Sequence, residues 1–268
     1  MLDRIINKLR REGIVGLFIG IYRQIAPSSY KSFQLCKDLI KGKIGIEIGG
    51  PSTVFSRKGF FPIYPIVSQL DNCNFSQSTT WEGEIAEGNT FKFDPGKATG
   101  HQYVAEAWNL AEIMTGTYDF LLSSHMIEHT ANPIGAISEW VRVLNDTGTL
   151  VIIFPHKDGA FDHRRPTTTL AHLIQDFSNG MGEDDLTHLP EILELHDLDR
   201  DPGAGSYENF IIRSRKNFEN RCLHHHVFDI QLAVELMNHM GLQICSAEAI
   251  RSYHIVIVAR KVPPQTKF

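Results

Sequence analysis

Two adjacent glycines at the end of a short apolar run are the first residues whose spacing points to chemistry. Isoleucine alternates through residues 44–48, a pattern typical of a strand buried in a sheet. Gly49 and Gly50 follow, and because glycine has no Cβ, a ligand can approach the bare backbone there. Ser52, after Pro51, is a good helix N-cap, and the free N–H groups of a helix N-terminus bind polar or anionic atoms.

An acidic residue completes this pattern further along the chain. Asp71 stands 22 residues beyond Gly49, after a second apolar stretch at 63–70. A carboxylate at that spacing can accept hydrogen bonds from both hydroxyls of a ribose. Strand, glycine turn, helix, strand and acid together indicate a site for an adenosine-containing cofactor.

Histidine is concentrated in one region: ten of the 13 fall between His125 and His226. Imidazoles titrate near neutrality, so one could remove a proton from a substrate, and several could bind a metal. His125 and His129 stand four residues apart with Glu128 between them, which is a common spacing on helices. We therefore expect no bound metal, and a polar surface that happens to be rich in histidine remains an alternative for the whole region.

Strand and helix patterns alternate along the chain, which favours an α/β protein with a largely parallel sheet. The apolar periodicity predicts strands at 44–48, 63–70, 118–123 and 149–154, a short strand at 90–93, and two closing antiparallel strands at 243–249 and 253–259. It predicts helices at 28–39, 54–58, 104–114, 133–144 and 228–240, besides amphipathic helices before residue 28.

Composition divides the chain into a basic beginning and an acidic remainder. Residues 1–43 hold nine Lys and Arg against three acids, a net charge of +6, whereas the whole chain carries −5. We interpret 1–43 as an N-terminal helical cap that could make a weak contact with a membrane surface or another protein. Residues 44–268 form the main domain, in which 156–227, rich in His, Asp, Glu and Arg, is an insertion over the sheet edge.

Several classes of partner and location are disfavoured. The acidic balance argues against a nucleic-acid substrate, which calls for a basic footprint. The longest apolar run near the start, 14–22, is far too short for an integral membrane segment and lacks the features of a signal peptide. The four cysteines form no Cys-x-x-Cys pair, which is typical of a reducing compartment, so we expect a cytoplasmic protein.

The residues from 118 to 129, Tyr-Asp-Phe-Leu-Leu-Ser-Ser-His-Met-Ile-Glu-His, carry a family likeness. Together with Asn132-Pro133, the helix pattern at 139–144 and Thr147-Gly148, they resemble the fourth-strand region of class I S-adenosylmethionine-dependent methyltransferases. Residues 47–50 look like that family's first motif, although Pro51 and Ser52 stand where further small residues are expected. The likeness covers roughly 44–155 and 228–260.

The resemblance implies a Rossmann-like sheet of seven mostly parallel strands with an antiparallel last strand, and helices on both faces. It also implies S-adenosyl-L-methionine as cofactor. Glu47 would lie near the ammonium group of the cofactor, Asp71 at its ribose, and Glu106, Ala107 and Trp108 beside its adenine. The full set of expected cofactor-binding residues is Glu47, Gly49, Gly50, Pro51, Ser52, Asp71, Glu106, Ala107, Trp108, Ser123, Ser124 and His125.

A methyltransferase that acts on a hydroxyl also needs a base. We expect His129, His156 and His163 to supply it, since they follow predicted strands or open the insertion. The acceptor is then a small molecule or a saccharide methylated on oxygen, with an anionic group that Arg164 and Arg165 could bind. Two alternatives remain: a nicotinamide-dependent oxidoreductase, disfavoured by the lack of a full Gly-x-Gly-x-x-Gly, and a non-catalytic module with the same fold.

Overall fold

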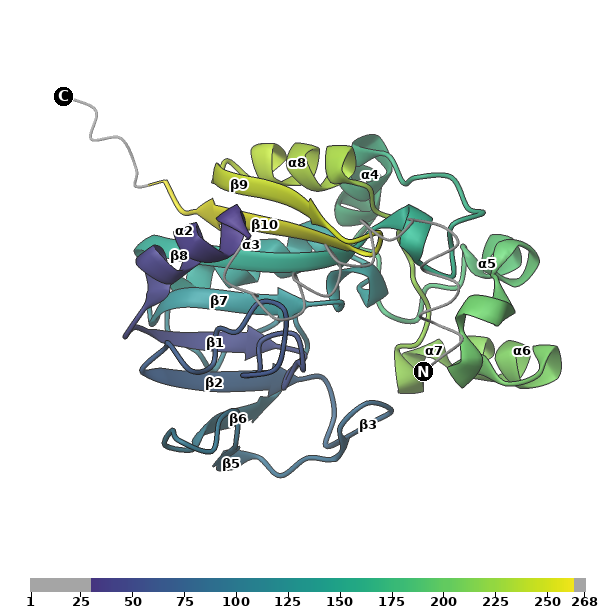
Figure 1. Ribbon diagram of the computed structural model, residues 1–268. Coiled ribbons are helices and arrows are strands. Elements are labelled where there is room, and N and C mark those ends of the chain that lie inside the picture. Colours follow the sequence, from purple (N-terminus) through teal and green to yellow (C-terminus); the bar gives the residue numbers. More distant parts are fainter. Residues whose placement is uncertain (1–29, 263–268) are drawn as a thin grey trace, which may run out of the picture.

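The computed structural model describes residues 30–262, and a sheet of eight strands runs through its centre (Figure 1). The strand order is β5-β6-β2-β1-β7-β8-β10-β9. The sheet strands are β1 Ile44–Ile48, β2 Gln69–Asn74, β5 Gly88–Phe91, β6 Gly100–Val104, β7 Tyr118–Ser124, β8 Leu144–Pro155, β9 Gln243–Ile250 and β10 His254–Arg260, and β3 Ser78–Thr79 and β4 Gly83–Glu84 form a separate hairpin.

Five neighbouring strands, β6, β2, β1, β7 and β8, run parallel, and β10 runs antiparallel between β8 and β9. This is the Rossmann-like α/β fold that the sequence predicts, with its antiparallel last strand. The sheet has one strand more than the seven predicted, because β6 at 100–104 was not predicted. The short strand predicted at 90–93 overlaps β5, which pairs antiparallel with β6 at the sheet edge.

Side chains that alternate along the central strands fill two cores, one on each face of the sheet. On β7, Leu121 enters one core while Phe120 and Leu122 enter the other. Gly45 on β1 makes room for this packing, because a Cβ there would lie 2.2 Å from the Phe120 ring.

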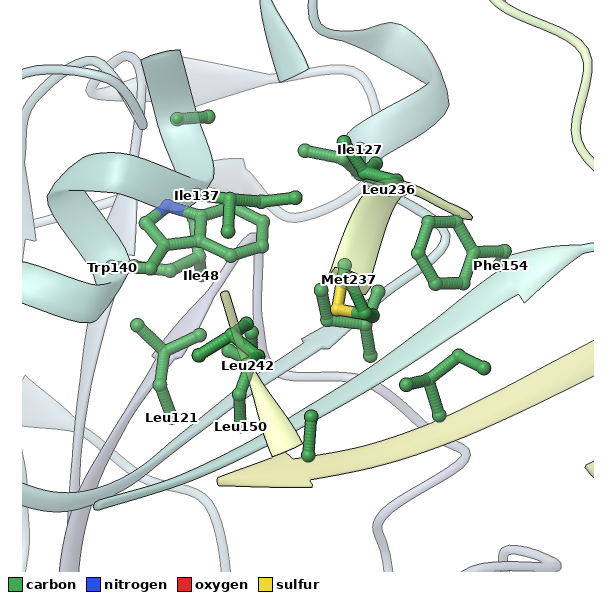
Figure 2. Close-up of a cluster of buried hydrophobic side chains, with 14 of the residues drawn as sticks. Ile48, Leu121, Ile127, Ile137, Trp140, Leu150, Phe154, Leu236, Met237 and Leu242 are labelled. Carbon is green, nitrogen blue, oxygen red and sulfur yellow. The ribbon is translucent and has the colours of Figure 1, made fainter. Parts of the chain in front are cut away.

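The first core lies beneath α3 Pro133–Val143, α4 Leu170–Asn179 and α8 Ile230–His239. Figure 2 shows Trp140 of α3 and Met237 of α8 packed against side chains of the sheet. Asn132 caps α3 as predicted, since its Oδ1 accepts a hydrogen bond from the N–H of Gly135 at 2.9 Å.

The second core is covered by α2 Lys31–Ile40 and by residues 53–67. The short helix predicted at 54–58 is absent, and these residues form successive turns instead. The N–H groups of Phe61 and Tyr64 bond back to the carbonyls of Val54 and Phe55, which folds the aromatic side chains down onto the sheet.

The helix predicted at 104–114 is also wrong, because β6 ends at Val104 and turns follow. Side chains of α3 form hydrogen bonds with the backbone N–H and carbonyl groups of these turns. Arg142 donates to the carbonyls of Leu110 and Ile113, and Glu139 accepts from the Leu110 N–H. These contacts replace the hydrogen bonds of a local helix.

Residues 156–227 contain α4, α5 Leu189–Leu195, α6 Tyr207–Arg215 and α7 Asn217–Asn220. Helix α4 packs beside α8 over the sheet, whereas α5 to α7 lie beyond the carboxyl ends of the strands (Figure 1). A small core of their own, including Ile192, Phe210 and Leu223, holds these outer elements together. Of the expected cap, only 30–43 lies within the described residues; the helices predicted before residue 28 lie outside them. Within 30–262, no helix is long and apolar enough to cross a membrane.

Candidate functional site

A cavity of about 660 Å³ opens at the carboxyl ends of the parallel strands. One wall comes from the carboxyl ends of β1, β2, β6 and β7 and the residues just after them, among them Gly49, Asn74 and Ser124. The opposite wall comes from the β3–β4 hairpin and from the segment 201–224. The cavity therefore occupies the crevice in which open α/β sheets bind their ligands.

The glycine turn forms the floor of the cavity and is braced from below. Gly49 has a positive φ of 80°, a conformation that favours glycine, and it lines the cavity with Pro51 and Ser52. Gly50 points away, because a Cβ there would lie 2.3 Å from the carboxyl carbon of Glu47.

Glu47 lies beneath this turn and not in the cavity, contrary to the prediction. Its carboxylate accepts from the N–H of Ser52 at 3.0 Å and from the hydroxyl of Tyr64 at 2.7 Å. Burial raises the pKa of Glu47 to about 8, although both hydrogen bonds oppose that shift. Glu47 thus holds the shape of the loop that a ligand would contact.

Asp71 does not line the cavity, so its predicted role at a ribose is not supported by its position. Its carboxylate accepts from the Tyr118 hydroxyl at 2.7 Å and from the His101 N–H at 2.8 Å. The strand predicted at 63–70 is wrong, because β2 begins at Gln69 and continues three residues past Asp71. Asn74, at the end of β2, is the residue that reaches the cavity.

Asn74 belongs to a buried amide network that holds its side chain at the cavity edge. Its Nδ2 donates to the carbonyl of Gly50 at 3.2 Å, and its Oδ1 accepts from Gln102 at 3.0 Å and from Asn72. No sequence motif marked this residue.

The residues predicted to lie beside adenine differ in their position relative to the cavity. Glu106 and Ala107 line the cavity, but Trp108 does not and is 45% exposed. Four other aromatic residues line it instead: Phe75, Trp81, Phe161 and Tyr253.

At the end of β7, Ser124 and His125 line the cavity and Ser123 is fully buried behind it. Among the described residues, Ser124 Oγ has no hydrogen-bond partner although it is buried. A buried hydroxyl of this kind is suited to a polar ligand atom. His125 Nε2 lies 2.8 Å from His254 Nδ1, and its ring stacks on Tyr253.

Two imidazoles and a carboxylate face one another on the side of the cavity nearest the insertion. His129 Nε2 and His224 Nε2 each lie 3.9 Å from Glu128 Oε1. Burial raises the pKa of Glu128 to about 7 and lowers that of His129 well below its ordinary value.

The other nitrogen of each ring fixes its tautomer. His129 Nδ1 lies 2.9 Å from the carbonyl of Leu223, and His224 Nδ1 lies 2.7 Å from Asp162 Oδ2. Since these oxygens can only accept, Nδ1 carries the proton in both rings and Nε2 presents a lone pair to the cavity. Sequence reasoning noted Glu128 only between His125 and His129 and gave no role to Asp162 or His224, because His224 meets Glu128 and Asp162 only in the folded chain.

The remaining predicted bases lie outside the cavity. His156 Nδ1 accepts from the N–H of Asp158 at 3.2 Å, and His163 Nε2 lies 2.9 Å from Asp197. The predicted anion-binding arginines are also used elsewhere. Arg164 pairs with Asp197, and buried Arg165 donates to the carbonyls of residues 224 and 225.

A family model described as a methyltransferase domain matches residues 81–152, about a quarter of the chain. This segment contains β6, β7 and their cavity-facing ends. The match supports S-adenosylmethionine as the cofactor of the site. No curated protein matches the chain.

Solved structures similar to the chain include three S-adenosylmethionine-dependent methyltransferases. One from Thermotoga maritima, a possible histamine N-methyltransferase, is 14% identical, with 97% of each chain covered and a TM-score of 0.44. One from Methanosarcina mazei is 14% identical, with 86% of this chain and 98% of that chain covered and a TM-score of 0.46. One from Listeria monocytogenes is 16% identical, with 86% and 97% covered and a TM-score of 0.45. Likeness at this level adds nothing to what the strand order already establishes.

Proposed function

We propose that this chain is an S-adenosylmethionine-dependent methyltransferase that methylates a hydroxyl of a small-molecule or carbohydrate acceptor. The observation that supports this most directly is the make-up of the cavity. A bare glycine turn and strand ends form one wall, and two imidazoles, His129 just after β7 and His224 in the opposite wall, turn unprotonated Nε2 atoms to the same space.

The chain's own residues suit the cofactor. Gly49 offers open backbone, Ser52 and Asn74 offer polar groups at the ends of β1 and β2, and unpartnered Ser124 Oγ faces the same space. Ala107 leaves a small apolar wall for a flat base. When bound, S-adenosylmethionine supplies a methyl group activated by its sulfonium.

The imidazoles supply the base. Burial lowers the pKa of His129, which keeps its ring neutral with a free Nε2 lone pair at physiological pH but also makes it a weaker base. Acceptance of the hydroxyl proton therefore depends on the nearby carboxyl group of Glu128. Asp162, 2.7 Å from His224 Nδ1, holds the second imidazole in the same tautomer and stabilises it after protonation. Glu128 lies between both rings and can take the proton onward.

The cavity lining favours a neutral polar acceptor over an anionic one. Both arginines at the cavity already have acidic partners: Arg213 pairs with Asp201 at 2.6 Å, and Arg221 with Glu106 and Glu183. Trp81 is 54% exposed and its ring lies 5.4 Å from that of His129. A flat apolar surface beside a base is suited to a sugar ring.

Transfer of labelled methyl groups to a panel of mono- and oligosaccharides tests this proposal. We expect His129→Ala or His224→Ala to slow transfer by about 100-fold or more, the range for general-base catalysis, with the cofactor affinity nearly unchanged. His239→Ala, an exposed histidine on α8, is the matched control and should retain full activity.

Unchanged rates in both cavity variants would remove the imidazoles from the mechanism. Hydride transfer with a nicotinamide cofactor would favour the oxidoreductase alternative. A protein that binds S-adenosylmethionine but methylates no acceptor would favour the non-catalytic module.

A further inference from the structure

Outside the cavity, three histidines and an aspartate from separate parts of the chain turn their side chains to one point. His172 and Asp176 lie one helical turn apart on α4, His188 immediately precedes α5, and His226 precedes α8. One ligand atom from each lies within 4.8 Å of all the others.

The closest approaches among these atoms have the dimensions of a tetrahedral metal site. His172 Nε2 lies 3.1 Å from His188 Nε2 and 3.3 Å from Asp176 Oδ2, and His226 Nε2 lies 2.9 Å from the same oxygen. Zinc–nitrogen bonds of about 2.0 Å place tetrahedral ligands about 3.3 Å apart.

Hydrogen bonds account for two of these contacts, His172 with His188 and His226 with Asp176, but not for the approach of His172 to Asp176. A ring nitrogen has a single lobe in the ring plane, which is either an N–H or a lone pair. His172 Nε2 faces both His188 Nε2 and Asp176 Oδ2, so one proton there cannot serve both neighbours equally. A cation at the common point accepts lone pairs from all of them at once.

Ring orientation and burial agree with this reading. The three imidazoles are inclined to one another by 60° to 77°, so they meet edge-on around a centre and do not stack. His226 and Asp176 are buried, whereas His172 and His188 are partly exposed and leave a path from solvent.

We propose that these four side chains bind one Zn²⁺ ion. Three nitrogens and one carboxylate oxygen are a donor set that zinc accepts, and a full set of four protein ligands is typical of a structural site. This differs from the expectation of no bound metal, because the ligands come from positions that sequence spacing does not connect.

The ion would join the insertion to the sheet-covering helices. It ties α4, which packs over the sheet, to the start of α5 and to the segment 224–226. That segment carries His224 into the cavity, and its carbonyls are held by Arg165. The zinc site therefore stabilises the wall from which the proposed base projects.

A second cluster, Glu128, His129 and His224, is the competing location for a metal. Its contacts are wider, with both imidazole nitrogens 3.9 Å from Glu128 Oε1, and it has one ligand fewer. Single substitutions in one cluster or the other show which of the two binds the metal.

The test measures metal in the full chain, purified from zinc-supplemented cells with any histidine tag removed. Mass spectrometry gives the zinc content, and the protein stripped by a chelator is titrated with Co²⁺, whose tetrahedral complexes absorb strongly in visible light. We expect about one zinc per chain in the wild type, in His239→Ala and in His129→Ala.

His188→Ala and His226→Ala should weaken Co²⁺ binding by about tenfold or more and lose the tetrahedral spectrum. The partly exposed His188 keeps the test valid if the buried His226 variant fails to fold, and circular dichroism checks the fold of each. The proposal is overturned if the wild type binds neither ion, if His188→Ala keeps full metal content, or if only His129→Ala loses it.

Discussion

Replacing Glu128 by Gln isolates the energetic cost of its buried carboxyl group. Glu128 is 1% exposed, and burial raises its pKa from 4.5 to about 7. An acid whose pKa is higher in the folded state binds its proton more tightly there. Its contribution to stability is therefore complete below pH 4.5 and is lost as the pH rises to about 7.

The magnitude follows from the shift. Each pKa unit is worth 1.36 kcal/mol, so ionisation of Glu128 costs the folded protein about 3 kcal/mol by pH 8. Gln has the same shape and does not ionise. We expect Glu128→Gln to match the wild type near pH 4.5 and to be more stable by about 3 kcal/mol at pH 8.

Urea unfolding at pH 5, 6, 7 and 8 measures this difference directly, since other titrating groups are common to both proteins and cancel. Glu194→Gln, at an exposed position in α5, is the control and should differ from the wild type by less than about 0.5 kcal/mol at every pH. A Glu128→Gln variant no more stable than the wild type at pH 8 would refute the reasoning.

Three further substitutions test other parts of the account. Asp71→Ala should lower the free energy of unfolding in urea by about 1–3 kcal/mol, because the buried hydroxyl of Tyr118 loses its acceptor. The affinity for S-adenosylmethionine, measured by calorimetry, should not change; a weaker affinity would show that Asp71 contacts the cofactor. Gly50→Ala should lower the free energy of unfolding by about 1–3 kcal/mol and weaken cofactor binding, because its Cβ would meet the carboxyl group of Glu47. No change in either quantity would show that Glu47 does not support the turn. Asp162→Asn should lower kcat by about 100-fold or more without changing the cofactor affinity, because the amide can favour the wrong tautomer of His224. An unchanged kcat would exclude the Asp162–His224 pair from catalysis.

Much of the fold follows from local patterns. The alternating apolar run of β1 and the Asn-Pro start of α3 both lie where the sequence predicts, because burial and capping act on neighbouring residues. The helix predicted at 104–114 failed for a non-local reason. Arg142 and Glu139, some thirty residues away, bind its backbone groups and hold the segment in turns.

Residues of the cavity could be predicted only where neighbouring residues in the sequence form it. Gly49 at the end of a strand marks the cavity floor, but Asp71 was chosen by spacing, and β2 runs three residues further than the spacing implied. Asp162 and His224 are 62 residues apart and meet through a 2.7 Å contact that no motif encodes. Long-range pairs of this kind need the folded chain.

Calorimetric titration with S-adenosylmethionine is the most direct test that the cavity is a cofactor site. We expect one molecule to bind per chain, and Gly49→Val to weaken binding by at least about tenfold, because φ there is positive and a Cβ would lie 2.9 Å from the side chain of Met126, which also lines the cavity. Gly42→Val is the matched control: Gly42 has a similar positive φ of 72° but no heavy atom within 4 Å of a Cβ, and its variant should bind normally. Absence of binding in the wild type, or equal weakening in both variants, would contradict the account.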